Sequence, residues 1–194
     1  MVMLLPAELA WYVTGRFYLD DKKENNLADY GYFLHLAGID QAQLFAGKLG
    51  EGTACFTFAA VPFTAGGVSN GNLRLSVDPV GEFSIYLQRT PVGDFDDPLS
   101  FAQGERIATF RRASMVVGTT VDNADGHALV ASNVFSARLV DSKPFTLGGR
   151  DYDIAQLLPV GVTQFGTAAG APITPTPKGY QKVAAFTGSA IALA

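Results

Sequence analysis

Hydrophobic and polar residues alternate along most of this chain, and the alternation has a period of two. The clearest example is residues 71–90, GNLRLSVDPVGEFSIYLQRT, in which apolar residues alternate on both sides of Asp78-Pro79-Val80-Gly81. A period of two is typical of strands with one buried face. Asp, Pro and Gly also stand where a tight turn prefers them. The stretch therefore predicts two strands joined as a β-hairpin.

The same pattern predicts further strands at residues 8–20, 30–36, 53–63, 106–121, 128–140 and 182–192. Gly148-Gly149 separates two short apolar segments and predicts another hairpin, whereas residues 41–46 fit either a helical turn or a strand. Evenly spaced short strands are typical of sandwiches and barrels. We predict an all-β, single-domain fold over residues 1–194: an antiparallel β-barrel of calycin-like shape or a β-sandwich, with about nine to eleven strands.

Composition favours the barrel. The chain has 194 residues, 14 phenylalanines and 7 tyrosines, and only 16% of its residues are charged. These are more bulky apolar groups than a thin sandwich needs. A barrel of about eight strands can be filled by side chains or can hold one small ligand. We expect a filled interior slightly more than a hollow one.

Charge and patterning exclude several classes of partner. The net charge is −4, and the largest basic cluster is Arg111-Arg112, so we expect no nucleic-acid partner. No apolar run approaches the roughly 20 residues of a membrane helix, so we expect a soluble protein with no membrane span. The first ten residues lack a positive region and contain Pro6, so they do not predict a signal peptide. The compartment stays open between the cytoplasm and export with a leader removed before residue 1.

The residues around the candidate catalytic and metal-binding motifs argue against both functions. Residues 67–71, GVSNG, match the G-x-S-x-G nucleophile motif, but a strand rather than a helix follows, so we predict an ordinary turn. Residues 122–126 resemble a calcium loop, yet the flanking positions lack the acidic ligands of an EF-hand. Two histidines, His35 and His127, with one cysteine are too few for a structural zinc site. We expect no metal and no cofactor.

Two features stay open at this point. The turn with Asp94, Asp96 and Asp97 fits either a solvated acidic turn or a cation site. The lone cysteine, Cys55, excludes an intramolecular disulfide. Its apolar neighbours predict a buried thiol of raised pKa and low reactivity.

Adjacent strand residues point to opposite faces, so either Arg111 or Arg112 should face the interior. An inward arginine either pairs with a carboxylate or lines a ligand cavity. Glu105, Asp141 and Asp153 are the candidate partners. If the strand is instead at an edge, both arginines face water.

The function that these patterns favour is binding of a small apolar or aromatic molecule in a barrel cavity. One alternative is a cofactor-independent cyclase or isomerase that uses the same cavity, with an inward acid or base. Another is a structural protein that assembles with copies of itself, and a homo-oligomer is compatible with each. No catalytic residue can be named. The candidate ligand-binding residues are the aromatic and cationic side chains Trp11, Tyr30, Tyr32, His35, Tyr86, Arg111 and Arg112.

Overall fold

The computed structural model describes residues 2–22, 26–60, 63–64, 66–70, 73–78, 81–112, 116–122 and 128–194. Side chains are described within these ranges except at 63–64, 66–70, 73–78, 116–119, 122 and 128–129.

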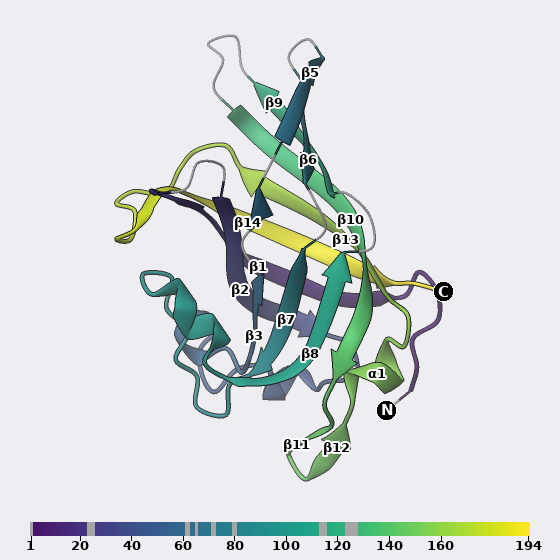
Figure 1. The fold of residues 1–194 in the computed structure, drawn as a ribbon. Helices are drawn as coiled ribbons and strands as arrows, with labels where there is room; N and C mark the ends of the chain where they lie inside the picture. The colour runs from purple at the N-terminus through teal and green to yellow at the C-terminus, as the bar shows by residue number, and fades with distance from the viewer. Residues whose placement is uncertain are drawn as a thin grey trace.

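The described chain consists almost entirely of β-strands (Figure 1). The strands are β1 (Leu9–Asp20), β2 (Asn26–Leu36), β3 (Phe56–Ala60), β4 (Phe63–Thr64), β5 (Gly66–Asn70), β6 (Leu73–Asp78), β7 (Glu82–Leu87), β8 (Glu105–Arg112), β9 (Val116–Asp122), β10 (Ala128–Ser142), β11 (Phe145–Leu147), β12 (Arg150–Tyr152), β13 (Gly161–Ala169) and β14 (Tyr180–Ala192). The helical turns are η1 (Gln41–Gln43), η2 (Glu51–Thr53), η3 (Pro98–Ala102) and α1 (Ile154–Leu157). The predicted all-β class is confirmed.

Within the described residues, eight strands close into an antiparallel barrel, in the order β13-β14-β1-β2-β3-β7-β8-β10. Pairing of β10 with β13 completes the ring, from Val130 opposite Ala169 to Arg138 opposite Gly161. Closure selects the barrel over the sandwich. We use "lower end" for the end where β1 begins at Leu9, and "upper end" for the end where β8 finishes at Arg112.

Three further strands, β9, β6 and β5, extend the sheet outside the barrel and join it through β10. The later half of β10 pairs with β8, from Ala137 to Ser142, while its earlier half pairs with β9. Strand β9 continues to β6 and β5, which extend beyond the barrel at the upper end (Figure 1). The predicted hairpin of β6 and β7 is therefore wrong. Both segments are strands, but β6 pairs with β5 and β9, whereas β7 pairs with β3 and β8.

Aromatic side chains fill the lower half of the barrel. Trp11 meets Phe33 and Phe110 edge to face, with ring centroids 5.7 and 5.6 Å apart. Phe83 stacks on Phe110 at 5.2 Å. Small residues make room for such rings. A Cβ on Gly31, for example, would lie 2.8 Å from the Phe58 ring. Large groups thus lie opposite small ones, as a narrow barrel requires.

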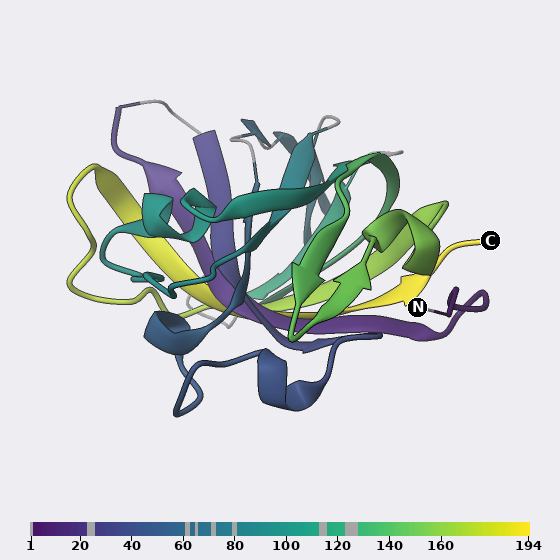
Figure 2. The same cartoon turned by 90° about the horizontal axis from the view of Figure 1, so that it is seen from below.

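The lower end is closed by the segment after β10 (Figure 2). The predicted Gly148-Gly149 hairpin is confirmed as β11 and β12, and both glycines have positive φ angles of 57° and 75°. Helix α1 follows, with the Asp153 carboxylate accepting a hydrogen bond from the Ala155 amide as its N-cap. Ile154 and Leu157 of α1 are buried in the barrel core.

The outer face of β1 and β2 carries a second apolar cluster, covered by the segment that contains η3. Tyr18, Tyr30 and Val183 pack there against Phe95 and Phe101. The Tyr18 hydroxyl donates a hydrogen bond to the carbonyl oxygen of Phe95 at 2.8 Å.

Candidate functional site

A buried ion pair crosses the interior of the barrel. Arg112 ends β8 and faces inward, and its Nη2 lies 3.9 Å from Oδ1 of Asp29 on β2. The two side chains are only 3% and 10% exposed. The Arg112 guanidinium also lies 4.9 Å from the centre of the Phe135 ring, in cation–π contact.

Of the two interpretations of Arg111 and Arg112, an inward arginine or two arginines in water, the structure supports the first, but the proposed carboxylate partners are wrong. Glu105 binds Arg89, Asp141 lies near Arg106, and Asp153 caps α1. Arg111, the other member of the pair, points outward and binds Glu82. The carboxylate that pairs with Arg112 is Asp29, 83 positions earlier in the sequence. Such a pairing depends on the closure of the barrel rather than on local spacing.

Asp29 is positioned by the alternation of β2. It shares the inward face with Gly31 and Phe33, while Ala28 and Tyr30 face outward into the second cluster. Burial raises the pKa of the Asp29 carboxyl above its ordinary value, and the nearby Arg112 charge opposes that shift. Its Oδ1 is buried and accepts no hydrogen bond from the residues that the structure describes. The sequence could have indicated this site, because Asp29 is an even number of positions from Phe33 and so points to the same face of the strand.

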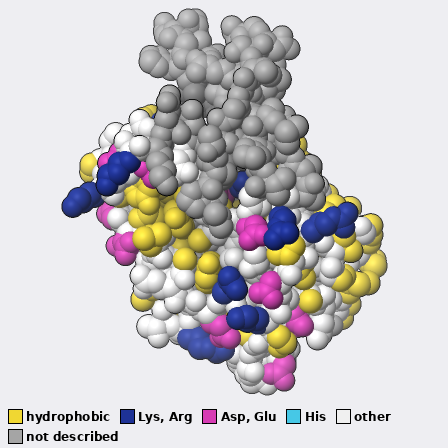
Figure 3. All heavy atoms as spheres, viewed as in Figure 1, with side chains coloured by type: hydrophobic (Ala, Val, Ile, Leu, Met, Phe, Trp, Pro, Cys, Tyr) yellow, Lys and Arg dark blue, Asp and Glu magenta, His cyan; other side chains and the backbone are white. Residues whose placement is uncertain are grey.

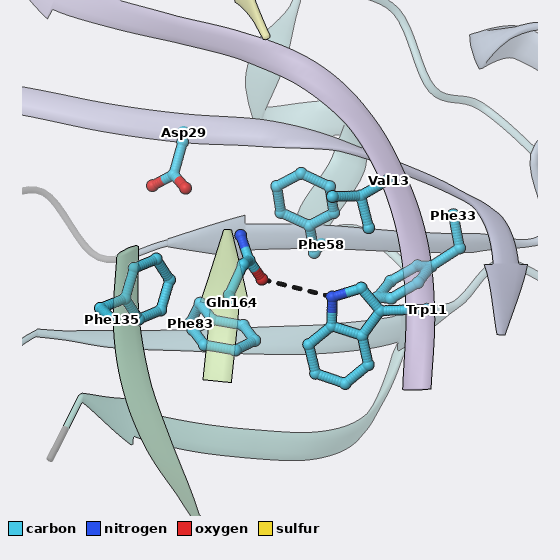
Figure 4. Close-up of a pocket in the computed structure, with 8 residues that line it drawn as sticks. All are labelled: Trp11, Val13, Asp29, Phe33, Phe58, Phe83, Phe135 and Gln164. Carbon is cyan, nitrogen blue, oxygen red and sulfur yellow. Dashed lines mark hydrogen bonds between the residues drawn. The ribbon is translucent and has the colours of Figure 1, made fainter. Parts of the chain in front are cut away.

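A small cavity lies beside Asp29 (Figure 4). It has a volume of about 10 Å³ and is walled by Trp11, Val13, Phe33, Phe58, Phe83 and Phe135, with Asp29 and Gln164 as its polar members. The Trp11 indole Nε1–H donates a hydrogen bond to Gln164 Oε1 at 3.3 Å. Figure 4 shows the amide nitrogen of Gln164 pointing away from the indole. A volume of this size corresponds to about one water molecule.

A fourth polar residue, Asn133, faces the interior from β10, two positions before Phe135. Its Oδ1 is buried and has no hydrogen-bond donor among the described residues. A Cβ added to Gly166 would lie only 2.6 Å from this oxygen, so the glycine makes room for the Asn133 amide. Asp29, Arg112, Asn133 and Gln164 thus place polar groups among the aromatic side chains of the barrel interior; the sequence analysis identified only Arg112.

Some inward-facing side chains near the upper end are only partly buried. Phe17, Ala131 and Ala184 face inward near the upper end but are only half-buried, unlike Trp11 and Phe33 below. A larger hollow of about 650 Å³ lies at the same end, between the β13–β14 connection and Leu19, Gln181 and Lys182. Its size is that of a ligand pocket, but it has no buried polar group.

The predicted site residues lie on both the inner and the outer face of the barrel. Trp11 and Arg112 face the interior, as described above. Tyr30 and Tyr32 pack in or against the outer cluster, and Tyr86 alternates with the inward Ile85 and Leu87 on β7. His35 lies beside the exposed Tyr12, with ring centroids 6.3 Å apart. The structure therefore does not bring the seven residues into one site.

Burial also perturbs the outer tyrosines. It raises the pKa of Tyr30 to about 12, with smaller contributions from Tyr180, Asp29 and Tyr86. The pKa of Tyr18 is raised by burial as well, although Arg16 acts in the opposite direction. These hydroxyls remain protonated near neutral pH and act as hydrogen-bonding groups of the packed outer layer.

The remaining candidates have local roles. Asp94 Oδ1 accepts a hydrogen bond from the Asp96 amide in the acidic turn. No group of three or more His, Cys, Asp or Glu side chains in the described ranges is arranged to hold a metal ion. Desolvation raises the pKa of the Cys55 thiol, as predicted, but the residue is only half-buried rather than buried. Ser69 lies within β5 rather than in a turn, which corrects that prediction. His127 and most of residues 122–126 lie outside the described residues.

Comparisons with protein-family models, curated proteins and solved structures found no match. In the part of the chain that the structure describes, no helix is long and apolar enough to cross a membrane. On the face of the molecule seen in Figure 3, basic and acidic side chains are interspersed rather than gathered by sign.

Proposed function

We propose that this protein binds one small, mainly apolar or aromatic molecule inside the barrel, beside Asp29 and Arg112 and toward the upper end. The observation that carries the proposal is that the burial of inward-facing side chains differs between the two ends of the barrel. Toward the lower end Trp11 and Phe33 are fully buried in the aromatic core. Toward the upper end Phe17, which pairs with Asp29, and also Ala131 and Ala184 are only half-buried although they face inward.

The buried charges support the same proposal. Removing a carboxylate and a guanidinium from water is costly, and replacing such a pair by apolar residues is often neutral or stabilising. A barrel that only needed to fold could fill this part of its interior with the aromatic groups it uses elsewhere. Polar groups that converge on an aromatic wall are instead typical of sites that orient a small ligand.

A substitution that fills the upper half tests the proposal. Ala184 faces inward opposite Phe17 in the β1–β14 pairing, whereas the next residue, Ala185, faces outward opposite Arg16. We expect Ala184→Phe to weaken binding of the neutral dye N-phenyl-1-naphthylamine by about tenfold or more, because the ring takes up the ligand's space. Ala185→Phe is the matched control and should bind the dye as the parent does.

Fluorescence titration at neutral pH measures both affinities, and thermal unfolding checks that each variant is folded. Absence of dye binding by the parent would refute the proposal. Equal weakening by the two substitutions would refute the location.

One observation favours the enzymatic alternative: Asp29 is an inward acid with a raised pKa beside an aromatic cavity. Such a carboxyl can act as a general acid or base. If a compound bound by the parent is converted to an isomer, Asp29→Asn should abolish conversion and retain binding, as followed by proton NMR. Unchanged conversion would remove Asp29 from the chemistry.

A further inference from the structure

We propose that the ligand of this barrel is a neutral molecule with an apolar or aromatic body and one hydroxyl group, and that the hydroxyl occupies the small cavity beside Asp29. This inference rests on the proposed binding function and specifies the chemistry that the site selects.

The size of the cavity limits what can enter it. With a volume of about 10 Å³, it accommodates one oxygen-sized group. The rings of Phe33, Phe58 and Phe83 wall it and leave no room for a ring of the ligand. Only a terminal group can enter, and the body of the ligand must lie beside Asp29, against the half-buried Phe17, which pairs with Asp29, and Ala184, which pairs with Phe17.

The hydrogen-bonding groups at the cavity select a hydroxyl. Because Trp11 donates to Gln164 Oε1, the other end of that amide is Nε2, which carries two N–H donors. Figure 4 shows this nitrogen pointing away from Trp11. Asp29 Oδ1 is an acceptor that receives no hydrogen bond within the described ranges. The cavity thus offers one donor and one acceptor, and a hydroxyl complements both because it donates to the carboxylate and accepts from the amide.

The local charges disfavour ionic groups. A carboxylate or phosphate would be repelled by Asp29 and has no hydrogen to donate to it. An ammonium group would lie close to the Arg112 guanidinium, whose Nη2 is 3.9 Å from Asp29 Oδ1, and could not accept from Gln164. The pair contributes no net charge to the site, so a neutral group is the one that adds no uncompensated charge.

Four naphthalene derivatives of similar size test this selection on the parent protein: 1-naphthol, 1-methoxynaphthalene, 1-naphthoate and 1-naphthylmethylammonium. We expect isothermal titration calorimetry at neutral pH to show 1-naphthol binding at least tenfold more tightly than 1-methoxynaphthalene. The methyl ether keeps the oxygen but removes the donor, and leaves Asp29 Oδ1 without a hydrogen bond. Both ions should bind more weakly than 1-naphthol.

A variant locates the selectivity. Gln164→Met removes the amide donor at similar length, and we expect it to reduce the preference for 1-naphthol over the ether to threefold or less. Gln181→Met is the matched control: Gln181 is exposed at the upper rim, where its Nε2 donates to the Asp20 carbonyl oxygen at 3.0 Å. This control should keep the parent's preference. If Gln164→Met does not fold, the comparison of the four ligands on the parent decides alone.

The outcomes separate the two proposals. Equal binding of 1-naphthol and its ether, tighter binding of either ion, or binding of the neutral dye but none of the four would overturn the hydroxyl site and leave the binding function standing. Binding of neither the dye nor any of the four would refute the binding function itself.

Discussion

At the scale of single residues, the Asp29–Arg112 pair dominates the interior. The two groups lie 3.9 Å apart at their nearest charged atoms, which is an ion pair without a short hydrogen bond. Burial disfavours both charges, and their mutual attraction offsets part of that cost. Each charge is therefore tolerated only because the other is present.

This dependence predicts a non-additive pair of substitutions. Arg112→Met should lower the free energy of unfolding by about 3–5 kcal/mol, because it leaves the buried Asp29 without its cation. Adding Asp29→Leu should restore most of that loss, because it removes the uncompensated charge. Urea unfolding of the parent, both single variants and the double variant measures the coupling. A double variant less stable than either single one would contradict the explanation.

The raised pKa of Asp29 predicts a pH dependence of stability. The folded state holds this proton to higher pH than the unfolded state, whose Asp pKa is about 3.9. The contribution of Asp29 is therefore most favourable below about pH 4 and is lost as the pH rises through the raised value. Relative to Asp29→Asn, the parent should lose stability as the pH rises above about 4, as measured by urea unfolding. A difference that stays constant with pH would exclude this linkage.

The sequence predicted part of this site. Opposite orientation of adjacent strand residues indicated that one of Arg111 and Arg112 could face the interior, and Arg112 does, although the pattern alone also allowed both to face water. The choice between them, and the partner Asp29, depends on the register of strands that meet only when the barrel closes. Asp29 and Gln164 do share strand parity with core residues, and an inward polar residue is the signal that parity alone could have given.

At the scale of elements, the strands of the lower half act as a frame for one aromatic cluster. Phe83 of β7 stacks on Phe110 of β8 and meets Trp11 and Phe135 edge to face. The Phe83 ring thus joins β7 to β1 and β10, which are distant from it in sequence. The expectation of a filled interior is met in this half.

Truncating one of these rings should be costly. Phe83→Ala should lower the free energy of unfolding by about 3–5 kcal/mol, the range for a packed core aromatic that leaves a cavity. Phe165→Ala is a matched control on the outer face of β13, where the ring is 45% exposed, and its loss should be clearly smaller. Chemical denaturation of both variants tests this difference. Equal losses would mean that Phe83 is not packed as described.

Strands were easier to predict than their partners. Alternation located β1, β6, β7 and β14, because it reflects a local pattern of burial. It could not show that β6 pairs with β5 and β9 instead of β7, because many apolar strands offer equivalent edges. Turn residues indicate that the chain changes direction and do not choose which strands hydrogen-bond.

At the scale of the whole molecule, the two ends of the chain complete the structure together. Strand β14 pairs with β1 from Leu9 opposite Ile191 to Asp20 opposite Tyr180, and also with β13. The barrel therefore cannot close until β14 has paired with both β1 and β13. Contacts of such long sequence separation are typical of slowly folding β proteins.

This closure predicts a single cooperative unfolding transition. The chain has one tryptophan, Trp11, which lies 1% exposed in the barrel core, so its fluorescence reports the opening of the ring. Far-ultraviolet circular dichroism reports all strands, including β5, β6 and β9 outside it. Because β10 belongs to both the barrel and that extension, we expect the two signals to change at the same urea concentration. A dichroism change that precedes loss of the Trp11 signal would show that the extension unfolds separately, and would contradict the prediction of one domain over residues 1–194.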